Sequence, residues 1–326
     1  LYLTRSDKLI MYAALLCATQ LLIRIVYGHY CSCHFKEVRY YWGWDLKLFK
    51  EMLYFGGWNL WGGFATVLFS QGINILLNMF FGPFVNAARG IAVQVQGAVT
   101  QFSTNFQTAL NPQITKSYAL GDFTYMHSLI FRSSKFTFLL LAVISFPILL
   151  ETEMILQLWL NMVPAYTVVF VRLMLCITII DAMGGAFMVA AQSTGRVRFY
   201  QSVVGGILLA IVPVSYVVLR LGAAPWSVFL IHFCVCTVAF FVRLFIIRSM
   251  IHLSLYSYFH AVLLRCLYVL LLAMPLPIGL LYIFPATLWA GISVCFVSVL
   301  TISLSSYRVG LAEGERKFIK LSLIHI

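Results

Sequence analysis

Charged residues are scarce in this sequence: Asp, Glu, Lys and Arg together make up 10% of its 326 residues. Soluble globular domains carry about 25% charged residues, so an ordinary soluble domain is excluded. Hydrophobic residues make up 62% of the chain. They recur in runs of about 20 residues, the length that a bilayer core requires of a helix. We therefore predict an all-α fold, a polytopic membrane helix bundle with short polar connections.

The sequence also lacks the residue patterns of most enzymes and metal sites. Its eight Cys are scattered, and the CSCH stretch at 31–34 has no second ligand pair at zinc-like spacing. It holds no Ser-His-Asp grouping, paired acidic site or glycine-rich phosphate loop. His232 lies in an apolar run, and we interpret it as a hydrogen-bonded packing residue. We expect no enzymatic activity, no metal and no cofactor.

An initiating Met and a cleavable signal peptide are missing as well. The chain opens on LYLTRSDK and closes on KLSLIHI. Neither stretch resembles a natural terminus, so we expect a fragment of a longer protein.

Nine apolar runs are long enough to cross a bilayer. They are 9–28, 52–80, 86–111, 136–159, 165–191, 200–220, 226–248, 261–283 and 285–305. The net charge of +12 comes from Lys and Arg that cluster in every second connection, which is typical of cytoplasmic loops and does not indicate a nucleic-acid partner. The basic connections contain Lys36, Arg39, Lys47 and Lys50; Lys116, Arg132 and Lys135; and Arg196 and Arg198, and the seventh connection is flanked by Arg243, Arg248 and Arg265. We therefore predict that the C-terminus faces the cytoplasm and that the first span begins outside.

The run 86–111 is unusual because more than half of its helical circumference is polar yet almost uncharged. Its candidate cavity-lining residues are Arg89, Gln94, Gln96, Gln101, Asn105 and Gln107. Unpaired amides cost several kcal/mol each in hydrocarbon. Hydrogen bonding between helices usually needs one or two such residues, and a helix on the membrane surface would carry more Lys and Arg. We predict that this face lines a hydrated cavity.

The neighbouring run 52–80 has a matching polar face. Its candidate lining residues are Asn59, Ser70, Gln71, Asn74 and Asn78. Two adjacent helices with uncharged polar faces predict one shared cavity, and amides and hydroxyls suit a hydroxyl-rich ligand such as a sugar. A lipophilic cation would prefer carboxylates and aromatic faces.

Two charges at membrane depth are further candidates. Asp181 is the one carboxylate well inside an apolar run; it could relay protons, bind Na⁺ as a coupling ion, or pair with a basic residue. Arg89 opens the polar helix. Its guanidinium suits phosphate, although an arginine at the interface also reaches lipid headgroups.

The stretches FGPFVNAARGIA (81–92) and FQTALNPQITKSYA (106–119) resemble a known family. Over about 50–125 the chain is similar to the start of the second lobe of bacterial polysaccharide flippases, in the multidrug/oligosaccharidyl-lipid/polysaccharide exporter superfamily. The resemblance implies up to fourteen helices in two six-helix lobes plus two more. Residues 1–45 would then be the last helix of a missing N-terminal lobe with its cytoplasmic linker, 46–250 the C-terminal transport lobe, and 251–326 two additional helices with a cytoplasmic tail.

The resemblance also implies a function. Such a protein would move polyprenyl-diphosphate-linked oligosaccharide across the bacterial cytoplasmic membrane by alternating access, for cell-surface polysaccharide biosynthesis. Its expected partners are that lipid-linked substrate, membrane lipids, H⁺ or Na⁺ as a coupling ion, and polysaccharide-assembly proteins of unknown identity.

Three other functions compete with the flippase interpretation. An ion-coupled drug antiporter of the same superfamily is disfavoured because amides outnumber carboxylates on the polar faces. A membrane-embedded glycan polymerase, ligase or acyltransferase usually has a large, charged outer loop, and the outer loops here are a few residues long. A membrane scaffold that transports nothing leaves the long polar face without a purpose.

Overall fold

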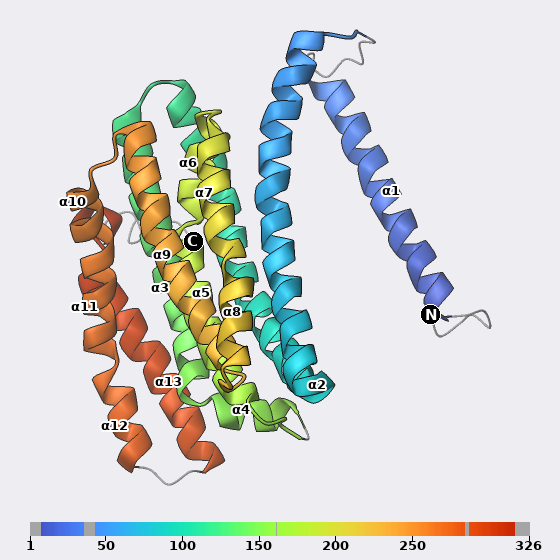
Figure 1. Cartoon of the computed structure of the whole chain (residues 1–326). Helices are drawn as coiled ribbons and strands as arrows, with labels where there is room; N and C mark the ends of the chain where they lie inside the picture. Colours follow the sequence, from blue (N-terminus) through green and yellow to red (C-terminus); the bar gives the residue numbers. More distant parts are fainter. Residues whose placement is uncertain (1–7, 36–42, 161, 284–286, 317–326) are drawn as a thin grey trace. The chain divides into compact units, whose positions relative to one another are not determined.

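The computed structural model describes residues 8–35, 43–160, 162–283 and 287–316, and in these ranges the regular structure is helical throughout (Figure 1). The first helices are α1 (Lys8–His34), α2 (Leu46–Ala119), α3 (Phe123–Leu150), α4 (Thr152–Trp159), α5 (Thr167–Met183) and α6 (Gly185–Ser193). They are followed by α7 (Val197–Leu209), α8 (Ile211–Arg220), α9 (Ser227–Ile251), α10 (Leu255–Tyr258), the π-helical turn η1 (Phe259–Leu263), α11 (Leu264–Ala273), α12 (Pro275–Ile283), α13 (Leu288–Ser305) and the π-helical turn η2 (Ser306–Gly310). The predicted all-α membrane bundle is confirmed: eight helical stretches in the described residues are long and apolar enough to span a membrane.

Helix α2 contains two of the predicted crossings. Gly82 interrupts it with φ +79° and ψ −179°, a region of backbone space that is essentially restricted to glycine. Pro83 follows, and its fixed φ suits the first position of a helix. Residues 19 apart in a straight helix would be roughly 28 Å apart, yet Arg89 Nη2 donates to Ser70 O at 2.9 Å. The chain therefore reverses at Gly82, and α2 consists of a first arm (46–81) and a second arm (83–119), visible as a hairpin in Figure 1.

The chain divides into two compact units, Leu1–Met52 and Leu53–Ile326. In the first, the described side chains of α1 are almost all exposed. In the second, α5 packs closely against both α3 and α9. The largest fully buried side chains there include Phe170, Phe187, Phe229 and Tyr258. Aromatic contacts join them in two pairs, with ring centroids 4.4 Å apart for Phe170 and Phe229 and 5.4 Å apart for Phe187 and Tyr258.

Several predicted boundaries were wrong. The helix expected over 136–159 begins at Phe123 instead, because Asp122 caps it by accepting a hydrogen bond from Tyr125 N at 2.9 Å. It ends at Leu150, and the short α4 follows. Other predicted runs also consist of consecutive segments: 165–191 corresponds to α5 and α6, and 200–220 to α7 and α8.

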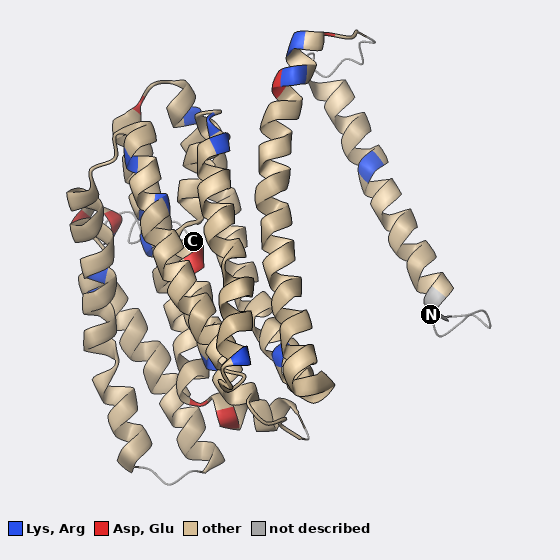
Figure 2. Cartoon of the chain, viewed as in Figure 1, with Lys and Arg blue, Asp and Glu red and all other residues tan. Residues whose placement is uncertain are grey.

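Charged residues are few along the helices (Figure 2), and two of the basic residues that we counted at basic connections are paired with carboxylates within the bundle. Lys135 is on α3, 4% exposed, and its Nζ lies 2.5 Å from Glu315 Oε2. Arg243 is on α9, and its Nη1 lies 2.8 Å from Asp181 Oδ1. Lys135 was predicted to lie in a connection, and that prediction was wrong, whereas Arg243 lies within the predicted run 226–248. A charge with a partner on another helix can lie inside a bundle, and a loop-charge count cannot identify that partner.

Candidate functional site

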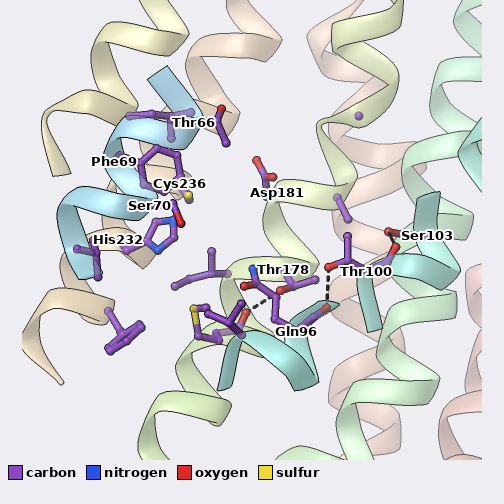
Figure 3. A pocket seen from close by; sticks show the side chains of 18 of the residues that line it. Thr66, Phe69, Ser70, Gln96, Thr100, Ser103, Thr178, Asp181, His232 and Cys236 are labelled. Carbon is purple, nitrogen blue, oxygen red and sulfur yellow. Dashed lines mark hydrogen bonds between the residues drawn. The ribbon is translucent and has the colours of Figure 1, made fainter. Parts of the chain in front are cut away.

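A cavity of about 440 Å³ lies within the Leu53–Ile326 unit. Both arms of α2 line it, together with α5, the start of α6, and α9 (Figure 3). Its polar lining residues are Thr66, Ser70, Arg89, Gln96, Thr100, Ser103, Thr104, Gln107, Thr178, Asp181, His232 and Arg243. The lining is therefore dominated by hydroxyl and amide groups, with two arginines and a single carboxylate.

The first arm of α2 contributes one narrow side of its helix. Thr66, Phe69, Ser70 and Ile73 line the cavity, and their spacings of three, one and three residues place them on adjacent turns of one face. Ser70 also holds Arg89 in place: its carbonyl and hydroxyl oxygens accept from Arg89 Nη2 at 2.9 and 3.3 Å.

The second arm contributes a longer polar row. Arg89, Gln96, Thr100, Ser103 and Gln107 follow one another at steps of seven, four, three and four residues, so they share one side of the helix. The hydroxyls of Thr100 and Ser103 donate to carbonyls one turn earlier in their own helix. These hydroxyls therefore keep lone pairs that can accept a hydrogen bond from a ligand.

Arg89 gives the cavity a partly unsatisfied positive charge. The side chain is half-buried, and its Nε has no hydrogen-bond partner. Among the ion pairs of the described residues, none involves Arg89. Its partners on Ser70 are neutral oxygens, so the guanidinium can still bind an anion.

Asp181 and Arg243 form an ion pair on the cavity wall. The Asp181 side chain is 55% exposed and the Arg243 side chain 13%, and in Figure 3 Asp181 points into the space between the lining helices. Of the roles open to Asp181 from the sequence, pairing with a basic residue is the one seen in the structure. Arg243 is a site residue that we missed, although its position inside the predicted run 226–248 was a usable signal.

His232 also lines the cavity, where it is 7% exposed. Its ring packs edge-on against Phe69 with centroids 5.2 Å apart, which is the packing we expected. The hydrogen bond that we also expected is not found at its Nδ1, which has no partner.

Five predicted site residues border the cavity and the others do not. Those that border it are Ser70, Arg89, Gln96, Gln107 and Asp181. Asn59 lies outside, where its Oδ1 accepts hydrogen bonds from Gln192 at 2.9 Å and Gln201 at 3.3 Å. It therefore connects the first arm to α6 and α7, the interhelical role that we considered the less favoured one.

The remaining predicted residues lie on other sides of the two arms. Gln71 accepts a hydrogen bond from Asn74 at 3.3 Å, and Asn78 is exposed. Gln101 donates to Asn105 at 2.9 Å, and both are exposed. Gln94 borders a separate, largely apolar hollow with Phe102, Ile144 and Trp159. The sequence analysis treated more than half of the circumference of the second arm as one polar face. In the structure, only a narrow row of residues on that face lines the cavity.

The lining can bind a ligand with many hydroxyls and one anionic group. Amides and hydroxyls donate to and accept from sugar hydroxyls, and a guanidinium matches phosphate oxygens. The described residues contain no group of three or more His, Cys, Asp or Glu placed to hold a metal ion.

Comparisons with known proteins do not identify a family for this chain. A scan with protein-family models, a search of curated proteins and a search of solved structures each returned no match for the chain.

Proposed function

We propose that the chain forms part of a flippase that moves polyprenyl-diphosphate-linked oligosaccharide across the bacterial cytoplasmic membrane, with its C-terminus in the cytoplasm. The observation that carries the proposal is a cavity of about 440 Å³, inside a membrane-spanning bundle, lined mainly by uncharged hydrogen-bonding side chains. Polar groups at membrane depth are costly and usually line a functional pathway. The sequence resemblance over about 50–125 supports the same substrate class.

The charges in the cavity favour an anionic ligand over a cationic drug. Two arginines and one carboxylate line it, and that carboxylate already pairs with Arg243. Arg89 is left to receive an anion, and a diphosphate offers several oxygens to a guanidinium. An antiporter for lipophilic cations would need an available carboxylate, so we place that function second.

Complementation tests the proposal. The complete reading frame that contains this chain is expressed in a bacterium whose own flippase gene is deleted, and surface polysaccharide is measured by immunoblot. We expect restoration by the natural sequence and about a tenfold loss with Gln96→Leu, since one hydrogen bond is worth about 1.4 kcal/mol. Gln101→Leu is the matched control, because Gln101 is exposed and away from the cavity. Drug resistance without restored polysaccharide would contradict the proposal and support the antiporter.

A further inference from the structure

The wall of the cavity contains a joint between two helices. Helix α5 ends at Met183 and α6 begins at Gly185. Around Gly184 the hydrogen bonds tighten to the three-residue pattern: Gly184 N donates to Asp181 O at 3.0 Å and Phe187 N donates to Gly184 O at 3.1 Å. Such local tightening often marks a hinge. Asp181 and Gly185, on the two sides of this α5–α6 joint, both line the cavity.

Three other helices hold the joint through their side chains. Gln107 of α2 donates from Nε2 to Ala182 O at 2.8 Å. Ser134 of α3 donates from Oγ to Met183 O, also at 2.8 Å. Arg243 of α9 donates from Nη1 to Asp181 Oδ1 at 2.8 Å. The joint is therefore held by hydrogen bonds, and other hydrogen-bonding groups, such as those of a ligand, can replace them. Purely apolar packing would not allow such a replacement.

The two glycines allow these side chains to lie directly on the joint. A Cβ on Gly184 would come 2.7 Å from Arg243 Nη1. A Cβ on Gly185 would clash with Gln107 Oε1. Arg243 and Gln107 therefore occupy the space that a side chain would fill, and movement of either one frees space beside the joint.

The Asp181–Arg243 pair is open to competition from the cavity. Arg243 donates to a single carboxylate oxygen, and its Nε has no hydrogen-bond partner. A guanidinium can bind a phosphate group through two parallel hydrogen bonds, which are stronger than one. Both partners line the cavity, so an anion bound there reaches Arg243 without unfolding the bundle.

We propose that Arg243 is a positioning residue that connects occupancy of the cavity to the α5–α6 joint: an anionic group in the cavity displaces Asp181 from Arg243, and the joint is released. The inference rests on the proposed function in one respect, that the ligand carries a diphosphate. A ligand shifts a conformational equilibrium only through its different affinity for the two states. Here the two states differ in whether the Asp181–Arg243 ion pair is formed, and the anion can bind Arg243 only in the state in which that pair is broken.

Pyrophosphate binding tests the proposal. The chain is reconstituted in nanodiscs of neutral phosphatidylcholine, and the affinity for inorganic pyrophosphate is measured by isothermal titration calorimetry. Asp181→Asn should bind about tenfold more tightly than the natural sequence, because Arg243 no longer has a competing carboxylate. Arg243→Gln should bind about tenfold more weakly. Arg172→Gln is the control, since Arg172 bonds to Thr152 Oγ1 at 3.2 Å and lies outside the cavity lining.

Hydrogen exchange supplies a second measurement that does not depend on either variant. In the natural sequence, pyrophosphate should accelerate amide exchange over 184–189 severalfold and leave α9 unchanged. A merely structural ion pair predicts no tightening in Asp181→Asn and no faster exchange at the joint, and that pair of results would overturn the proposal. Absent binding of pyrophosphate would overturn it too, whereas failure of the flippase assay alone would leave these measurements unaffected.

Discussion

Lys135 shows, at the scale of one residue, how a charge can lie inside an apolar helix. Its Nζ is 2.5 Å from Glu315 Oε2, and the same oxygen accepts from Ala312 N at 2.7 Å. Arg132 Nε lies 4.0 Å from the other carboxylate oxygen. Buried charges are tolerated when they are paired and their remaining hydrogen-bonding capacity is used. The pair also attaches the segment around Glu315 to α3.

Replacement of Lys135 by Met should destabilise the bundle strongly, because Glu315 would remain buried with a weaker partner. We expect a loss of about 3–5 kcal/mol in the free energy of unfolding. The measurement is a denaturant titration in detergent, followed by tryptophan fluorescence.

Two further variants make the test specific. Lys135→Met combined with Glu315→Leu should recover most of the loss, since no lone charge remains. Lys116→Met, at an exposed position near the end of α2, should change stability by less than about 0.5 kcal/mol. A double variant as unstable as the single one would show that packing at Lys135, rather than its charge, matters.

Helix α2 depends, at the scale of one element, on the reversal at Gly82. The φ of +79° with an extended ψ is accessible to glycine and strongly disfavoured for other residues. The same reversal brings Ser70 beside Arg89, so the geometry of one glycine positions two cavity residues.

Gly82→Ala should cost about 1–3 kcal/mol through backbone strain. No atom lies within 4 Å of a Cβ built there, so steric contact would not contribute. Gly90→Ala is the matched control: it is helical, equally open, and should be neutral or slightly stabilising. Equal stability of the two variants, measured by the same titration, would refute the strain argument.

The first arm of α2 also approaches α8 closely at Gly72. A Cβ there would lie 2.6 Å from Val212 Cγ2, and valine is stiff at χ1. Glycine therefore sets the distance between these two helices.

Gly72→Ala should destabilise the bundle by about 1–3 kcal/mol through overpacking. Val212→Ala in the same chain should restore much of the loss by removing the clashing methyl group. Gly63→Ala, which has nothing within 4 Å, provides the control. An additive double variant, scored as a double-mutant cycle of unfolding free energies, would argue against direct contact.

The functional hypothesis belongs to the scale of the whole molecule, where helices distant in sequence enclose one polar cavity. Residues of α2, α5 and α9 meet there, although α2 and α9 are separated by more than a hundred positions. A hydrated cavity and a dry polar seam would have the same residues, so solvent access is the property that distinguishes them.

Thr104→Cys should react with a membrane-impermeant, water-soluble maleimide in lipid vesicles, whereas Ala98→Cys should react at least tenfold more slowly. Both positions are exposed in the bundle, but Thr104 lines the cavity and Ala98 borders the apolar hollow beside Phe102. Peptide mapping by mass spectrometry locates each adduct among the native cysteines. Equal rates would contradict a hydrated cavity.

Composition and the length of the apolar runs determined the all-α membrane fold and the crossings. These depend on local properties, because each bilayer-spanning helix satisfies its own backbone hydrogen bonds. The polar row of the second arm was also visible in the sequence, and it correctly indicated Arg89, Gln96 and Gln107 as lining residues. Helical periodicity alone places those residues on one side.

Only the tertiary structure decided which polar residues share the cavity and which charges are paired. Gln101 and Asn59 looked equivalent to Gln96 in sequence. In the structure, Gln101 is exposed and Asn59 accepts a hydrogen bond from Gln192. Lys135 was assigned to a loop, and Arg243 to the flank of one, until their carboxylate partners were seen. The physical reason is that burial and ion pairing depend on the neighbouring helices, and helix periodicity contains no information about which helices are neighbours.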